Sequence, residues 1–105
     1  MAITPDPEQR LALLDGVVEA LAHPARRQIL MTIHFRGGRM SSGDIAGRFA
    51  HSWPTTTRHL QVLASAQLLR TSRNGRERIY EIDRDKLALL RDWLGWFFNE
   101  EGKAA

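Results

Sequence analysis

The hydrophobic period changes halfway along SWPTTTRHLQVLASAQLLRTSRNGRERIYEI, residues 52–82, and this change points to the fold. The first half repeats apolar residues at helical spacing, after Ser52 as an N-cap and Pro54 in the first turn. The second half alternates apolar and polar residues with a period of two, as a strand does. We therefore predict a helix over residues 53–66, followed by a β-hairpin.

Asn74-Gly75 is the predicted turn of this hairpin, because both loop positions of a type I′ turn need a positive φ. The turn places two strands at 68–73 and 76–82. In that register Leu69 lies opposite Tyr80, which gives an aliphatic–aromatic pair on the core face.

Helical signals on both sides of this stretch complete a set of about five helices. Asp6-Pro7 starts the first helix, His23-Pro24 separates it from the second, and Gly37-Gly38 ends the second. Ser41 begins a short third helix with capping-box spacing. The last helix begins near Asp83, after the hairpin.

Two short helices across a tight turn, followed by a hairpin, describe a winged helix-turn-helix. The predicted fold class is mainly α with a small β-hairpin, in a single domain over residues 1–105. The sequence shows neither an apolar run long enough to cross a membrane nor a cleavable leader. We therefore expect a cytoplasmic protein with no membrane partner.

The net charge of +3 is distributed unevenly along the chain. Residues 21–82 carry ten arginines against three acidic residues, a balance of +7, whereas residues 1–20 carry −3 and residues 83–105 carry −1. A basic block of this kind suggests a polyanionic partner, most often nucleic acid. A charged surface that meets only solvent is the alternative.

The outer face of the predicted fourth helix has side chains suited to reading DNA. With Leu60 at the centre of the buried face, a rotation of about 100° per residue places Thr55, Arg58 and Gln61 outside. Short hydroxyl side chains admit a helix into the major groove, while arginine can pair with guanine and glutamine with adenine. His59 is predicted at the flank, where it would donate to a phosphate. A polar helix face in solvent is the alternative.

Three arginines crowd the tip of the predicted hairpin, where they suit phosphates or the minor groove. Protection of an open sheet edge by charge is the alternative reading. With a serine at the start of the third helix added, the predicted DNA-contact residues are Ser42, Thr55, Thr57, Arg58, His59, Gln61, Arg73, Arg76 and Arg78.

Three segments in combination resemble the arsenical-resistance-repressor (ArsR) family of bacterial winged-helix regulators. LAHPARRQIL at 21–30 resembles the opening signature of the family, WPTTTRHLQVL at 53–63 resembles its recognition helix, and residues 68–80 resemble its wing. The resemblance implies a homodimeric repressor of a palindromic operator in double-stranded DNA. The helix at 53–66 would enter the major groove, and the wing at 68–82 would contact the backbone or minor groove. The first and last helices would form the dimer interface.

The last helix carries more apolar surface than one face of a small domain usually needs. Two tryptophans and two phenylalanines stand near its end, so we expect a partner surface there. Packing on the core of the same chain is the alternative. The predicted interface residues are Leu11, Leu14, Val18, Leu90, Trp93, Leu94, Trp96 and Phe97.

Cysteine is absent, which removes thiolate metal sites, cysteine nucleophiles and thiol switches. The last helix has no histidine, and the start of the third offers one carboxylate, Asp44. The pattern of metal-sensing family members is therefore missing, and we expect no metal and no cofactor. The sequence contains no nucleophile elbow, no phosphate loop and no paired carboxylates, so no motif in it indicates an enzyme.

A winged-helix module that binds another protein, without specific DNA binding, is the alternative function. The sequence identifies neither the operator nor the target genes, and it does not separate a repressor from an activator. It leaves open whether a small-molecule effector exists and identifies none. The role of Trp53 is also open, because the family usually has a polar residue there.

Overall fold

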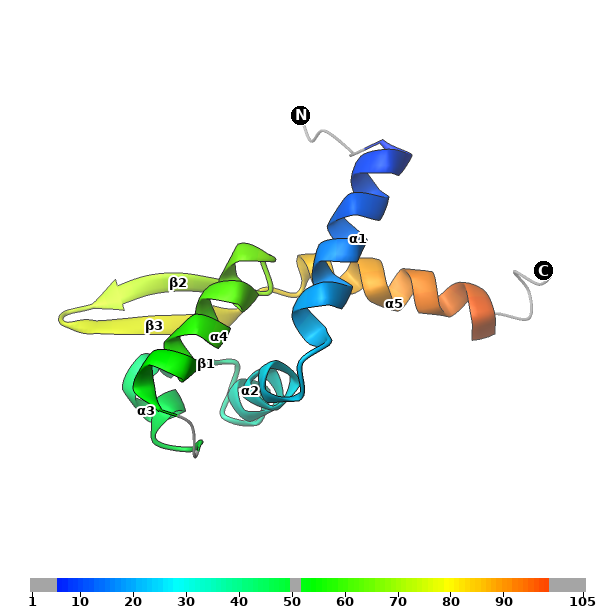
Figure 1. Ribbon diagram of the computed structural model, residues 1–105. Helices are drawn as coiled ribbons and strands as arrows, with labels where there is room; N and C mark the ends of the chain where they lie inside the picture. Colours follow the sequence, from blue (N-terminus) through cyan, green and yellow to red (C-terminus); the bar gives the residue numbers. More distant parts are fainter. Residues whose placement is uncertain (1–5, 50–51, 99–105) are drawn as a thin grey trace.

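The computed structural model describes residues 6–49 and 52–98, which form five α-helices and one three-stranded antiparallel sheet (Figure 1). The order along the chain is α1 (Pro7–Leu21), α2 (Pro24–Phe35), β1 (Arg39–Ser41), α3 (Ser42–Ala46), α4 (Trp53–Ser65), β2 (Leu69–Asn74), β3 (Glu77–Ile82) and α5 (Asp85–Phe98). The winged helix-turn-helix predicted from the sequence is confirmed. The short strand β1 was not predicted, because three residues are too few to show a period of two.

Side-chain caps begin the helices where the sequence predicts them. The Asp6 carboxylate accepts from the Gln9 amide at 2.7 Å, and the Gln9 side chain accepts from the Asp6 amide at 3.1 Å. These two bonds form a reciprocal capping box at the start of α1. His23 caps α2 and Ser52 caps α4, each through a backbone amide inside the helix.

Two helices end in turns that need a left-handed backbone. After α2, Gly37 and Gly38 have φ values of 95° and 93°, which glycine adopts without strain. After α4, Gln67 has a φ of 63°, and the Leu68 amide donates to the Leu63 carbonyl at 2.9 Å. This is a Schellman-type ending, and it directs the chain from α4 into β2.

The turn of the hairpin lies one residue later than predicted. Asn74 pairs with Glu77, so the loop residues are Gly75 and Arg76 instead of Asn74-Gly75. Gly75 has a φ of 66°, whereas Asn74 and Arg76 do not have positive φ values. A positive φ at the first loop position alone suits a type II′ turn, which also favours glycine there.

The shifted turn changes the pairing along the hairpin. Leu69 lies opposite Ile82, and Tyr80 lies opposite Thr71. The predicted Leu69–Tyr80 pair was therefore wrong. On the other side of β3, Met40 of β1 lies opposite Tyr80, so the sheet order is β1-β3-β2. Leu69, Met40, Tyr80 and Ile82 are all buried.

The core lies between the helices and the sheet. It is one cluster of buried residues: Val17, Ala20, Ile29, Leu30, Ile33, Met40, Ile45, Leu60, Leu63, Leu68, Leu69, Tyr80 and Ile82. No described residue of α5 is buried, although Leu87 and Leu90 pack against the cluster.

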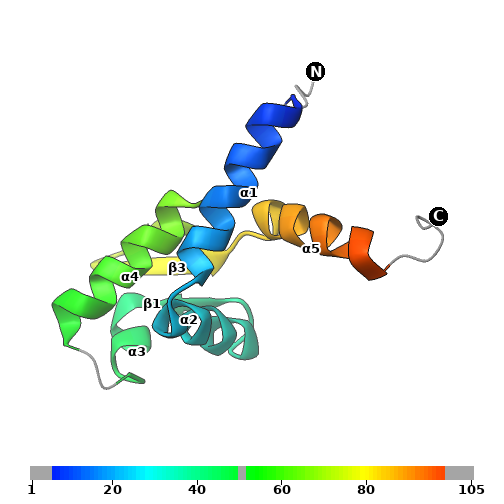
Figure 2. The same ribbon diagram turned by 45° about the vertical axis from the view of Figure 1, so that its right-hand side comes forward.

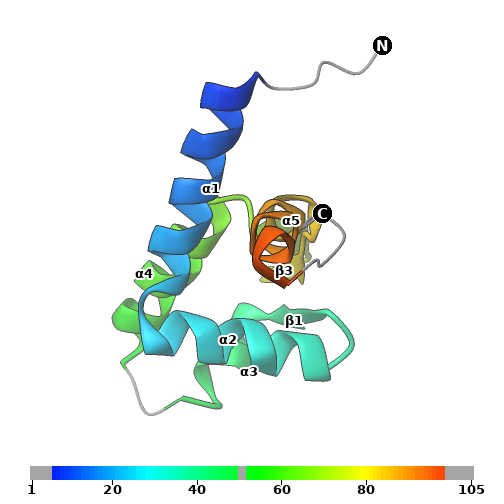
Figure 3. The same ribbon diagram turned by 90° about the vertical axis from the view of Figure 1, so that its right-hand side faces the viewer.

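The molecule is elongated, with extents of 49 × 33 × 22 Å. Figure 1 shows the hairpin of β2 and β3 at one end and α5 at the other. Figure 2 shows α1 and α5 leaving the body on the same side, away from the hairpin, and α1 packs against α5. Figure 3 views α5 along its axis, with α2 and β1 beneath it. None of the helices in the described part of the chain has the length and apolarity to span a membrane.

Candidate nucleic-acid interface

The outer face of α4 is polar and exposed. Thr55, Arg58 and Gln61 are exposed, while Thr56 and Leu60 are buried beneath them. Their exposure agrees with the predicted helical rotation. A contact between these side chains and DNA stays a prediction.

The cap of α4 leaves a hydroxyl group available at its first turn. The Ser52 hydroxyl donates to Thr55 Oγ1 at 2.9 Å and accepts from the Thr55 amide at 3.3 Å. In this arrangement the Thr55 hydroxyl keeps its own hydrogen, which can be donated to a phosphate oxygen. Thr57 on α4 and Ser42, the first residue of α3, are half-buried.

His59 does not lie at an exposed flank, contrary to the expectation from the sequence. Its exposed fraction is 7%, and its ring lies 4.6 Å from the ring of His23 between centroids, at 56°. Arg26 Nη1 lies 3.4 Å from His59 Nδ1. We therefore remove His59 from the DNA-contact set, because its ring faces α2 and the end of α1. The helical rotation placed it beside the buried face, but it could not show that α2 covers it.

Arg26 connects three helices. Its Nε donates to the Ala20 carbonyl at 2.6 Å, at the end of α1, while its guanidinium also lies against His59 of α4. Arg27, next in the chain, donates to the carbonyls of Leu21 and Ala22 at 2.9 and 3.2 Å. These arginines of the 21–30 segment therefore hold the body together and are not part of the exposed basic surface of α4. Sequence analysis missed this role, since charge counts do not separate the two kinds of arginine.

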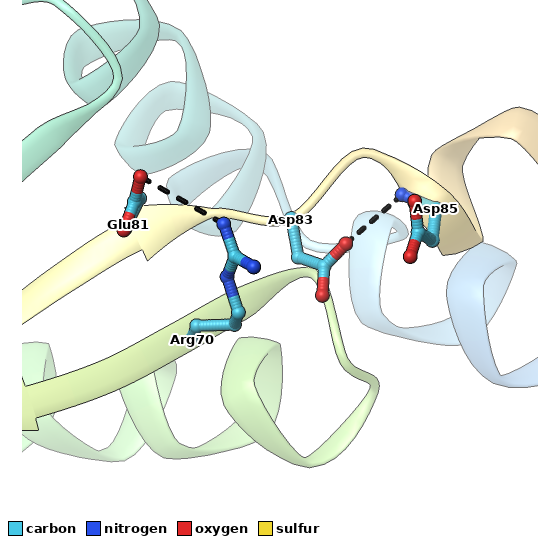
Figure 4. Close-up of polar contacts among 4 residues, drawn as sticks. All are labelled: Arg70, Glu81, Asp83 and Asp85. Carbon is cyan, nitrogen blue, oxygen red and sulfur yellow. Dashed lines mark hydrogen bonds and ion pairs between the residues drawn. The ribbon is translucent and has the colours of Figure 1, made fainter.

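The tip of the wing carries three closely spaced arginines. Arg73 and Arg78 are opposite each other across β2 and β3, and Arg76 stands in the turn. All three are exposed, and within residues 6–49 and 52–98 none of them forms an ion pair. At the base of the hairpin Arg70 differs, because it lies 3.7 Å from Glu81 (Figure 4).

Trp53 spans the two helices of the helix-turn-helix. Its exposed fraction is 57%, and its ring edge lies 4.0 Å from the position that a Cβ on Gly43 would occupy. The indole edge therefore lies beside the first turn of α3, at ordinary van der Waals distance.

α1 and α5 expose a second surface of different chemistry, here named the α1/α5 apolar face. Its exposed residues are Leu11, Val18, Trp93, Leu94, Trp96, Phe97 and Phe98. Phe98 was not among the predicted interface residues. Two other predicted members are less exposed: Leu14 is buried, although it lines the hollow between α1 and α5, and Leu90 is half-buried against the core.

No group of three or more His, Asp or Glu side chains in the described part of the chain is placed to hold a metal ion.

Comparison with known proteins finds transcriptional regulators of the same fold. The transcriptional repressor SdpR of Bacillus subtilis is 33% identical over 86 residues, which cover 82% of this chain and 90% of that protein. A solved ArsR family transcriptional regulator superposes with a TM-score of 0.76 at 26% identity, over 98% of this chain and 99% of that one. The chain belongs to the ArsR family.

A second similar structure is that of a homodimer. It is a homodimeric winged helix-turn-helix DNA-binding domain from Mycobacterium bovis, named a possible ArsR-family transcriptional regulator. It matches this ArsR-family chain with a TM-score of 0.63 at 30% identity, over 91% of this chain and 92% of that one. No family model matches the sequence.

Proposed function

We propose that this protein is a sequence-specific transcriptional repressor that binds a palindromic operator in double-stranded DNA as a homodimer. One observation carries the proposal: two neighbouring elements, α4 and the wing, carry exposed arginines that form no ion pair with the residues that the structure describes. An enzyme site or a metal site plays no part in it.

The cost of the wing arginines argues for a polyanionic partner. Like charges directly opposite each other on two strands destabilise the pair, and Arg73 and Arg78 are so placed. A DNA backbone relieves this repulsion, because each phosphate that meets an arginine also releases a counterion. Binding to DNA would therefore supply the negative charges that relieve the repulsion between the wing arginines.

The side chains of α4 divide into two roles in this proposal. Arg58 pairs with a guanine and Gln61 with an adenine in the major groove. Thr55, with Thr57 and Ser42 beside it, binds phosphates and sets the position of the helix. Trp53 keeps α3 and α4 at a fixed angle, so that both helices meet the DNA together.

The α1/α5 apolar face supports the homodimer. Contiguous apolar patches on monomers are usually small, and Trp96 and Phe97 are exposed by 74% and 68%. A hollow of about 340 Å³ between α1 and α5, bordered by Leu11, Trp93 and Trp96, offers a recess for side chains of a second copy. The two α4 helices of such a dimer would lie about 34 Å apart, one turn of DNA.

A salt titration tests the DNA-binding proposal. The full chain is titrated against the DNA upstream of its own operon, followed by fluorescence anisotropy, with a scrambled duplex as the control. We expect tighter binding to the upstream DNA, and log K that falls with log salt by about 0.9 for each phosphate neutralised. We place this activity in the cytoplasm, with the DNA.

Absence of binding at low salt would reject the proposal. It would favour the alternative, a winged-helix module that binds another protein. Equal binding to both duplexes would reject sequence specificity and leave only a general affinity for DNA.

A further inference from the structure

A hollow lies between α2 and the start of α5, apart from both surfaces described above. Its volume of about 430 Å³ falls within the range of about 300–1,000 Å³ typical of small-molecule sites. Four elements form its apolar floor: Leu21 of α1, Leu30 and Met31 of α2, Ile82 of β3 and Leu87 of α5. No predicted DNA-contact residue and no member of the α1/α5 apolar face lines it.

The rim of this hollow is basic. Arg27, His34 and Arg84 line it, and no acidic side chain does. Arg84 Nη2 lies 3.4 Å from His34 Nδ1. Arg27 gives its Nη1 hydrogens to the carbonyls at the end of α1 and keeps its Nε and Nη2 donors, so both Arg27 and Arg84 can donate into the hollow, with Arg84 at the α5 side.

Two of the acidic residues near Arg84 in the chain, Glu81 and Asp83, contact other groups. Glu81 lies 3.7 Å from Arg70, and the Asp83 carboxylate accepts from the Asp85 amide at 3.0 Å (Figure 4). Within residues 6–49 and 52–98, Arg84 forms no ion pair. Its guanidinium therefore lines the apolar hollow without a directly paired carboxylate among these residues.

We propose that this hollow binds an organic anion with an apolar chain, of the class of medium-chain carboxylates. The carboxylate would accept two hydrogen bonds from the Arg84 guanidinium, the geometry that arginine favours. The chain would lie on Leu87 and on Met31, whose flexible thioether adapts to ligands of different shape. The apolar floor alone would bind any apolar molecule of suitable size. The positive charge of Arg84 makes the site favour anions.

Binding of a ligand in this hollow would affect other helices, because its floor connects α5 to α2. The floor joins α5, which carries part of the α1/α5 apolar face, to α2, which packs against α4. A bound chain that separates α5 from α2 would therefore shift the dimer helices relative to the helices that contact DNA. This regulatory step rests on the proposed function, whereas the binding of the anion does not.

Calorimetry on the full chain without DNA tests the binding step. The probes are decanoate, decanol and decyltrimethylammonium, which share a chain and differ in the charge of the head. We expect decanoate to bind best, and Arg84→Gln to weaken it by about tenfold without changing decanol. Met31→Trp, which fills the hollow from an exposed position, should abolish binding of both. Arg36→Gln is the control, since it removes the same charge nearby without lining the hollow.

Three results would overturn the site. They are no saturable decanoate binding below about 1 mM, equal affinity for all three probes, and unchanged binding in Met31→Trp. Anisotropy with operator DNA tests the regulatory step separately. A DNA affinity that changes with decanoate in the wild type but not in Met31→Trp supports that step, and an affinity that does not change overturns it.

Discussion

The two ends of the molecule expose opposite chemistries. The end with α4 and the hairpin shows arginines and hydroxyls, and four of these arginines, Arg58, Arg73, Arg76 and Arg78, form no ion pair among the described residues. The end with α1 and α5 shows tryptophans and phenylalanines, and α5 buries none of its described residues. Both surfaces are costly for an isolated chain, the first by charge repulsion and the second by apolar exposure.

Each surface therefore predicts the chemistry of what covers it. Unpaired cations predict an anion, and uncovered aromatic rings predict another apolar surface. The division also predicts that the two surfaces can be disabled one at a time. Substitutions at one end should change binding to one partner directly and to the other only through the dimer.

Trp96→Glu should have the largest effect, because it places a charge in the middle of the α1/α5 apolar face. We expect dimer affinity to fall by about 100-fold, the scale of a central aromatic contact. Sedimentation velocity at micromolar concentration measures it. Phe35→Glu is the control, since Phe35 is as exposed as Trp96 but stands on α2. A Trp96→Glu protein that stays dimeric would contradict the assigned interface.

Replacing the three arginines at the wing tip, Arg73, Arg76 and Arg78, by glutamine should have the next largest effect. We expect DNA affinity to fall by about 30-fold, and the salt dependence to flatten by about 2.7 in log K per log salt. The dimer should be unaffected. Arg70→Gln is the control within the same hairpin, because Arg70 already has an acidic neighbour. An unchanged salt slope in the triple variant would place the wing away from the DNA.

Local chemistry made much of this fold predictable. Asp6 and Ser52 are helix caps in the sequence and in the structure, because an N-cap needs only the amides of its own helix. The hairpin was also predictable, but its register was not. Asn74-Gly75 and Gly75-Arg76 both allow a tight turn around the same glycine, and packing of the strands chose the second.

Long-range packing accounts for what the sequence did not reveal about the candidate site. The helical rotation placed His59 beside the buried face of α4, but its burial depends on Arg26 and His23, which are more than 30 residues away. Leu14 was assigned to a partner surface, and the structure shows it mostly covered by its own chain, at the wall of the hollow between α1 and α5. A pattern along one helix shows which side a residue faces and not what lies opposite.

Arg58→Ala should have a smaller effect than the loss of the wing, but of a different kind. We expect DNA affinity to fall by about tenfold and the preference for one base pair to relax. Anisotropy on operator duplexes with single base changes measures both. Arg58→Lys separates charge from geometry, since lysine keeps the charge without the two-pronged donor. If Arg58→Lys keeps full specificity, Arg58 binds a phosphate and reads no base.

Thr56→Val should have the smallest effect, and it should leave both surfaces unchanged. Thr56 is buried on the inner face of α4, and its Oγ1 has no hydrogen-bond partner among the described residues. A methyl group in its place removes a buried polar atom that gains nothing in return, so we expect about 1 kcal/mol of added stability. That gain corresponds to a rise of about 4–8 °C in Tm for a domain of this size, measured by thermal unfolding.

Thr55→Val is the control, because the Thr55 hydroxyl is exposed and bonded to Ser52. A destabilised Thr56→Val protein would mean that the hydroxyl has a partner in solution, such as a buried water. If Thr56→Val adds stability while dimer and DNA affinities stay constant, changes at either end cannot be attributed to general changes in folding.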